Sequence, residues 1–159
     1  MATPLDKNIK DLLEDEDTLK VLATTDENGV PHAVIKQTLH LGKEDNLVYL
    51  ELLESSQTNK NLVRSIWFDR KVAVTLKGKN GASYQIIGRP IKGIITGPEF
   101  QKYYIDIRKR LGDVDLATVW IIEPEEVTNQ TFSVRKAQED ARRPLFRHLD
   151  QLAKPAAAA

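Results

Sequence analysis

Residues typical of turns divide the first half of this chain into short apolar runs. This regular succession of runs and turns limits the folds that the chain can adopt. The clearest signal is the segment 26–29, which ends in Asn28-Gly29. Asn-Gly accepts the positive φ angles that tight hairpins need. Glycine-containing turns are also expected at 42–46 and 77–81. Strand-like runs joined in this order predict an antiparallel meander.

The strand-like runs are rich in β-branched and aliphatic residues. They are 18–25, 30–41, 47–53, 72–76, 82–95, 116–122 and 127–134. Gly88 and Pro90 interrupt the run 82–95, and they predict a bulge or a sharp bend there. Long bent strands are what the closure of a small barrel requires. We therefore expect a mainly β, α+β fold with flanking helices.

Helical spacing of apolar residues predicts helices over 5–13, 98–111 and 137–152, and another that begins at Thr58 as its N-cap. Pro98 in the first turn and Gly112 as the stop frame the third helix of the chain. Pro144 is a candidate break in the last helix. The tail 155–159 is low in complexity and is expected to fray, so 1–154 is expected to form a single domain.

The composition excludes several classes of site. The chain has no cysteine, which excludes disulfides, thiolate catalysis and cysteine-based metal sites. Its three histidines form no metal-binding pair, and its 23 basic and 23 acidic residues cancel. No apolar run approaches the roughly 20 residues that cross a membrane, and the N-terminus does not resemble a secretory signal. We expect a cytoplasmic protein without a metal site, a membrane span or a nucleic-acid partner.

A cluster of hydroxyl and amide side chains lies where the predicted strand 47–53 ends and a helix begins. It includes Ser55, Ser56, Thr58 and Lys60. The first N–H groups of a helix have no partner inside it, and the helix dipole adds partial positive charge. Such a place suits an anion, for example a phosphate. A capped helix with a solvated lysine explains the same residues, and both interpretations stay open here.

Two further polar residues, Lys36 and Thr38, share one face of the predicted strand 30–41. That face is either exposed to solvent or the wall of a polar ligand site. Two lysines and several hydroxyls together suit a phosphate. The chain has no P-loop, no G-x-S-x-G and no obvious pair of carboxylates for acid–base work. No residue is therefore a candidate for catalysis, and a bound cofactor would supply any reactivity.

Two stretches of the chain resemble the pyridoxamine 5′-phosphate oxidase-like, FMN-binding split-barrel superfamily. The segment 22–34 resembles the opening hairpin of that family. The segments 55–62 and 69–76 resemble its hydroxyl-and-lysine helix start and the Val-x-Val strand that follows. The resemblance covers roughly residues 18–135. It implies an antiparallel split β-barrel of six to seven strands that forms a homodimer and binds FMN at the dimer interface.

Carried over position by position, the resemblance implies a set of cofactor-binding residues. The flavin phosphate would be held by Lys36, Ser55, Ser56, Thr58 and Lys60, with Thr38 beside Lys36. The ring edge would meet the main chain of Leu50, Glu51 and Leu52 and the side chain of Ser83. Asn129 and Arg135, on the predicted last strand, would reach the flavin of the partner subunit.

The arginine-rich phosphate strand and the C-terminal substrate motif of true pyridoxamine-phosphate oxidases have no counterpart at 32–36 and 132–135. The resemblance thus implies a flavin reductase-like oxidoreductase of unknown substrate. One alternative is a non-enzymatic flavin- or haem-binding or sensing module on the same fold. A haem would need an axial ligand, for which the candidates are His32, His40 and His148. A barrel that binds a deazaflavin is the other alternative.

Large aromatic side chains offer support for the homodimer that does not depend on the resemblance. They are Trp67, Phe68, Trp120 and the aromatic face over 100–104. Aromatic residues are enriched where subunits meet, so part of this set is expected between two subunits. The other interpretation is that all of it fits in one core.

Overall fold

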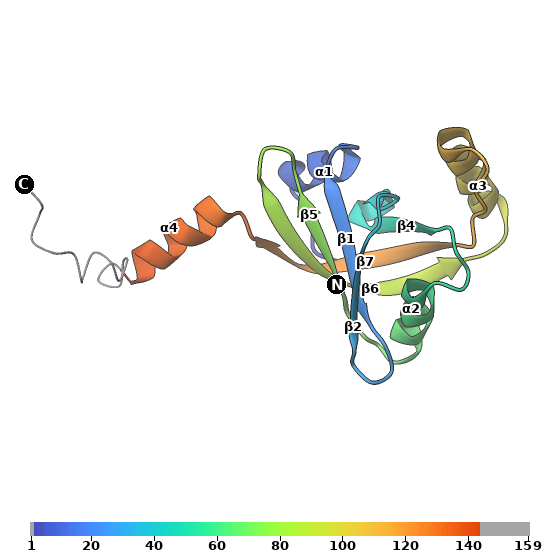
Figure 1. Cartoon of the computed structure of the whole chain (residues 1–159), viewed down its shortest axis with the longest axis horizontal. Helices are drawn as coiled ribbons and strands as arrows, with labels where there is room; N and C mark the ends of the chain where they lie inside the picture. Colours follow the sequence, from blue (N-terminus) through green and yellow to red (C-terminus); the bar gives the residue numbers. More distant parts are fainter. Residues whose placement is uncertain (1, 144–159) are drawn as a thin grey trace, which may run out of the picture.

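The computed structural model describes residues 2–143 (Figure 1). The helices are α1 (Lys7–Glu14), α2 (Gln57–Trp67), α3 (Pro98–Leu111) and α4 (Phe132–Arg142), with a 3-10 turn η1 (Lys43–Asp45). The strands are β1 (Leu19–Thr25), β2 (Pro31–Ile35), β3 (His40–Leu41), β4 (Leu47–Glu51), β5 (Val72–Lys77), β6 (Ser83–Ile94) and β7 (Thr118–Asn129). No helix among residues 2–143 is long and apolar enough to span a membrane.

The strands form one antiparallel seven-stranded sheet in the order β2-β1-β5-β6-β7-β4-β3. Its two edge strands, β2 and β3, are consecutive in the chain, and only residues 36–39 join them. The sheet must therefore curl until its edges approach each other. The main-chain N–H of Lys36 donates to the Lys20 carbonyl at 2.8 Å, and the Thr38 hydroxyl donates to the Leu50 carbonyl at 2.7 Å. We call this segment, 36–39, the seam of the split barrel.

The first hairpin has the geometry that its glycine predicts. The Asp26 N–H donates to the Val30 carbonyl at 3.1 Å, and the Gly29 N–H donates to the Asp26 carbonyl at 3.1 Å. Gly29 has a φ of 77°, a conformation that favours glycine. The turn between β5 and β6 repeats the pattern at 78–82. Both predicted hairpins are confirmed.

The interruption predicted in the long strand is also confirmed. The pairing of β6 with β7 shifts register between Ile87 and Gly88 and again between Pro90 and Lys92. At Gly88 the two main chains approach so closely that a Cβ would lie 2.6 Å from the Glu123 carbonyl oxygen. Glycine at this bulge is therefore a packing requirement.

The same bulges overturn the prediction of two separate strands at 116–122 and 127–134. The chain continues through 123–126 as part of one strand, β7, in which Glu123 pairs with Arg89 and Pro124 with Gly88. Pro124 lacks an N–H, and it is accommodated where the ladder is already irregular. Residues 132–134 belong to α4, which begins earlier than the predicted residue 137. The part of that prediction over 144–152, with its break at Pro144, lies outside the described residues, as does the predicted tail 155–159.

The predicted single strand 30–41 is likewise wrong, because the seam divides it into β2 and β3. Leu39 is fully buried in the core. The Gln37 side chain turns back to β1, where it donates to the Thr18 carbonyl at 2.9 Å and accepts from the Lys20 N–H at 3.0 Å. Because Leu39 turns into the core, the side chains of residues 36–39 do not point alternately to the two faces of a sheet, as those of a strand would.

Two apolar clusters hold the fold together. The larger fills the barrel and includes Leu22, Leu62, Val74 and Trp120. The smaller packs α3 against β4 and β7, with Ile107 and Val119 at its centre. Trp120 is only 4% exposed, so it belongs to the core and not to a subunit interface.

Candidate functional site

A small hollow of about 220 Å³ lies at the seam, between residues 35–38 and the end of β4. Its lining residues are Ile35, Lys36, Gln37, Thr38, Tyr49, Leu50, Glu51, Leu52 and Leu53. The fold thereby brings together Lys36, Thr38, Leu50, Glu51 and Leu52, which the sequence predicted as cofactor-binding residues. We call this feature the seam hollow.

Lys36 is the cation of the seam hollow, and it is half-buried. Its Nζ lies 5.5 Å from the centre of the Tyr49 ring, a cation–π contact. Within residues 2–143 no carboxylate lies at ion-pair distance from it. The ammonium is therefore available to an anion that enters the hollow.

Glu51 is a carboxylate in the same hollow, but its hydrogen bonds are already made. It is 1% exposed and accepts from the Tyr49 hydroxyl at 2.6 Å, the Ser56 hydroxyl at 2.8 Å and the Leu53 N–H at 3.1 Å. Burial, followed by the hydrogen bond to Glu51, raises the pKa of Tyr49, so its phenol remains a donor. Glu51 thus fastens the turn between β4 and α2.

At the start of α2, the structure overturns the predicted N-cap, and it exposes only some of the residues that were predicted to bind the phosphate. Its N-cap is Ser56, not Thr58, because the Ser56 oxygen accepts from the Asn59 N–H at 3.0 Å. Thr58 is the second residue of the helix and is fully buried, and its hydroxyl has no partner within residues 2–143. Ser55 and Lys60 are exposed beside the cap. The helix start therefore offers Ser55 and Lys60 to a ligand, while Thr58 faces the core.

Three predicted residues lie far from the seam hollow in the same chain. Leu50 pairs with Val119, whereas Asn129 is ten residues further along β7, or roughly 30 Å at strand spacing. Ser83 lies beside Asn129's end of the sheet, where its N–H donates to the Thr131 hydroxyl at 2.9 Å. Arg135, predicted on the last strand, is on α4 and bonds Gln138 at 3.2 Å. One chain does not bring these three to the seam hollow.

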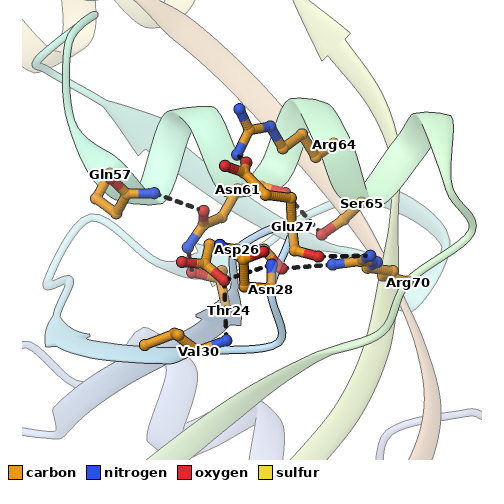
Figure 2. Close-up of polar contacts among 10 residues, drawn as sticks. All are labelled: Thr24, Asp26, Glu27, Asn28, Val30, Gln57, Asn61, Arg64, Ser65 and Arg70. Atoms are coloured by element: carbon orange, nitrogen blue, oxygen red, sulfur yellow. Dashed lines mark hydrogen bonds and ion pairs between the residues drawn. The ribbon is translucent and has the colours of Figure 1, made fainter.

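A polar network ties α2 to the β1–β2 hairpin and so fixes the helix relative to the seam (Figure 2). Asn61 is fully buried at its centre, where it donates to the Thr24 hydroxyl at 2.9 Å and accepts from the Gln57 amide at 2.8 Å. At the hairpin tip, Arg64 pairs with Glu27 and Arg70 donates to the Asp26 carbonyl. These contacts hold the hairpin and the helix in one arrangement.

Tyr49 and the Glu51 side chain line the seam hollow, and the sequence did not predict a role for either of them. The usable signal was their spacing, because residues i and i+2 of a strand point to the same face. Of the histidines, His32 is half-buried on β2, and the His40 Nδ1 lies 2.9 Å from the Thr38 carbonyl. His148 lies outside the described residues. No group of residues within 2–143 has the composition of a metal site.

Solved structures share this architecture. HupZ from Group A Streptococcus is 21% identical over 81% of this chain and 96% of that chain, with a TM-score of 0.68. A pyridoxamine 5′-phosphate oxidase-related, FMN-binding protein from Nostoc punctiforme is 13% identical over 79% of this chain and 82% of that chain, with a TM-score of 0.59. HutZ, the haem storage protein from Vibrio cholerae, is 14% identical over 80% of this chain and 95% of that chain, with a TM-score of 0.56.

This chain has the split-barrel fold of the pyridoxamine 5′-phosphate oxidase-like proteins. The resemblance predicted from its hairpin and helix-start segments is confirmed for the fold. No protein-family model matches the chain, and no curated protein does either. At these identities the similarity establishes the architecture, so the ligand must be argued from the site itself.

Proposed function

We propose that this split barrel binds FMN, with the phosphate at Lys36 and the flavin along the main chain of Leu50–Leu53. The observation that carries the proposal is the Lys36 ammonium, which has no carboxylate partner within residues 2–143 and lies in a hollow where Glu51 already accepts three hydrogen bonds. A charge-assisted bond from this ammonium to a phosphate oxygen would be strong. Lys60 and Ser55, exposed at the start of α2, are further candidates for the phosphate.

The size of the seam hollow supports a site that is completed by a second copy of the chain. Its volume of about 220 Å³ is below the roughly 300–1,000 Å³ of most ligand pockets. Two apolar residues on its rim, Ile35 and Leu53, are 60% and 65% exposed. A second chain packed over the rim would bury both and deepen the site, so we include a homodimer in the proposal.

The helix α4 supports the same assembly. It projects away from the sheet and has no buried residue (Figure 1). It has 11 residues, and isolated helices shorter than roughly 12–15 residues are marginal in water. A partner that packs against it would explain its stability. Arg135 on this helix and Asn129 at the end of β7 would then be the residues that reach the partner subunit's flavin.

The bound flavin would supply hydride or electron transfer, as in an oxidoreductase of the flavin reductase kind. The chain's own residues would bind and orient it: Lys36 at the phosphate, the β4 main chain at the ring edge, and Glu51 as the brace beneath the turn. No side chain of the seam hollow is assigned a catalytic role. Anaerobic addition of NADH or NADPH to the loaded protein, with loss of flavin absorbance, would support the oxidoreductase part.

The experiment for the binding site compares Lys36→Met with a matched lysine variant. Loss of one charge-assisted bond costs roughly 1.5–3 kcal/mol, which is about tenfold or more in FMN affinity. Lys71→Met is the control, since Lys71 is exposed and pairs only loosely with Glu125 at 3.7 Å. Equal FMN affinity in wild type and Lys36→Met would remove the phosphate assignment.

A further inference from the structure

A second and larger cavity, of about 680 Å³, adjoins the seam at Gln37 and Thr38, which also line the seam hollow. It is formed by the end of α1, residues 37–41 and the end of α3. Its lining residues are Leu13, Glu14, Glu16, Lys20, Gln37, Thr38, Leu39, His40, Leu41, Arg110 and Leu111. The proposed FMN site uses none of its charged groups. We call it the α1–α3 cavity.

Lys20 is the charged residue that the fold buries most deeply in this cavity. It is 4% exposed, and its Nζ donates to the carbonyls of Leu13 and Leu39, each at 2.8 Å. An ammonium has three N–H donors, so one remains without an acceptor within residues 2–143. No described carboxylate lies at ion-pair distance either. A buried cation without a counter-ion costs desolvation free energy, and a bound anion would offset part of that cost.

Two more basic groups line the same cavity close enough to act on Lys20 or on each other. Burial and then the charge of Arg110 lower the pKa of Lys20, and the smaller opposing effects of the Asp15 and Glu16 carboxylates do not cancel that shift. Burial lowers the pKa of His40, and the charges of Lys20 and Arg110 lower it further. The His40 Nδ1 faces a carbonyl, which only accepts, so the proton is on Nδ1, and Nε2 has no hydrogen-bond partner within residues 2–143. Bound negative charge would relieve this repulsion.

The acidic residues of the cavity limit which anion fits. Glu14 and Glu16 line it as well, and Glu16 is 87% exposed with its carboxylate 4.0 Å from Arg110. Water screens exposed carboxylates, so their electrostatic effect on a bound anion is weaker than that of the buried ammonium. Because they offset part of the positive charge of the cavity, a second negative charge on the ligand gains little attraction, while its desolvation cost rises steeply with charge, so a monoanion is favoured. The planar guanidinium of Arg110 also matches a carboxylate, which it can bind with two parallel hydrogen bonds.

We propose that the α1–α3 cavity is a binding site for small monoanionic carboxylates, held by the third N–H of Lys20 and the guanidinium of Arg110. The apolar walls at Leu13, Leu41 and Leu111 would take a short alkyl tail. The site is distinct from the proposed FMN site in its charged groups: Gln37 and Thr38 line both cavities, but the α1–α3 cavity shares no charged residue with the seam hollow.

The experiment is a two-dimensional NMR titration of the full chain with sodium propionate at constant ionic strength. Saturable shifts are expected in the amides of residues 37–41 and in the His40 ring. Arg110→Gln should weaken binding by about tenfold. Lys109→Gln, which removes the neighbouring exposed lysine of α3, should leave it unchanged.

Lys20→Met tests the buried ammonium directly, and it should abolish the saturable shifts. If that variant does not fold, the pair Arg110→Gln and Lys109→Gln still decides the matter. Three results would overturn the proposal: no saturable shift in wild type at millimolar propionate, equal affinity in the two α3 variants, or phosphate binding as tightly as propionate.

Discussion

At the scale of single residues, two opposite charges in the seam hollow are treated differently by the fold. Glu51 is surrounded by three donors and is nearly inaccessible, whereas Lys36 has an aromatic ring beneath it and no carboxylate at ion-pair distance within residues 2–143. A satisfied buried charge stabilises structure, and an unsatisfied cation at a hollow attracts a ligand. This contrast separates a bracing role for Glu51 from a binding role for Lys36.

The bracing role predicts that Glu51→Gln destabilises the protein. The amide would present an NH₂ group to hydrogen bonds that now need an acceptor, and at least one buried donor would lose its partner. We expect a loss of about 1–3 kcal/mol in the free energy of unfolding, measured by urea denaturation. Glu54→Gln is the matched control, because Glu54 is exposed two residues before the cap. A Glu51→Gln variant as stable as that control would contradict the assignment.

His40 predicts a pH dependence of stability. Its pKa is lowered in the folded protein, chiefly by burial, so the unfolded chain binds the proton more tightly. The contribution of His40 is therefore complete above about pH 6.5 and is lost as the pH falls towards the folded-state pKa. Urea midpoints at about pH 7.5 and about pH 5.5 should differ less in His40→Gln than in wild type. His32→Gln is the matched control, and an equal decline in wild type and His40→Gln would refute the prediction.

At the scale of helices and strands, the sequence correctly predicted the features that depend on the residue at the position itself. The hairpin glycines, the bulge at Gly88 and the α3 boundaries at Pro98 and Gly112 all follow from backbone preferences of the residue itself. The seam and the continuous β7 do not, because they depend on pairing partners far away in the chain. Leu39 turns inward only because the barrel closes there, and 123–126 stays extended only because β6 pairs with it.

The same limit applies to the candidate site. Lys36, Thr38 and the β4 residues were predicted from a polar face and a family resemblance, and the fold gathers them in one hollow. The role of the Glu51 side chain and the burial of Thr58 were missed, since each depends on which way the start of α2 faces. Sequence spacing alone does not set that rotation.

The close approach at the β6–β7 bulge predicts that Gly88→Ala destabilises the sheet. The added Cβ would meet the Glu123 carbonyl oxygen at 2.6 Å, so the strands must separate. We expect a loss of roughly 1–3 kcal/mol by chemical denaturation. Gly29→Asn is the control, because a Cβ added there has no heavy atom of the described residues within 4 Å beyond its chain neighbours, and asparagine tolerates the positive φ. If both variants were equally stable, the bulge would not be the tight contact described.

At the scale of the whole molecule, the proposed homodimer predicts a mass of twice 18.0 kDa in analytical ultracentrifugation. Ile35→Ser combined with Leu53→Ser should weaken self-association, because both side chains are exposed at the rim of the seam hollow. Ile105→Ser is the control, since Ile105 is an exposed apolar residue on α3. If the wild-type protein were a monomer at micromolar concentration, the proposed homodimer would be wrong. If the double variant associated as strongly as the wild type, the dimer interface would not lie at the rim of the seam hollow.

FMN binding is tested by the visible absorption spectrum of the freshly purified protein, followed by FMN titration of any colourless fraction. We expect a flavin spectrum or saturable FMN uptake at one site per chain. A colourless protein that does not take up FMN would show that the barrel is not an FMN-binding protein, and a deazaflavin would be the next ligand to titrate. A haem-type spectrum would contradict FMN binding as well, and it would direct attention to His32, His40 and His148 as axial ligands.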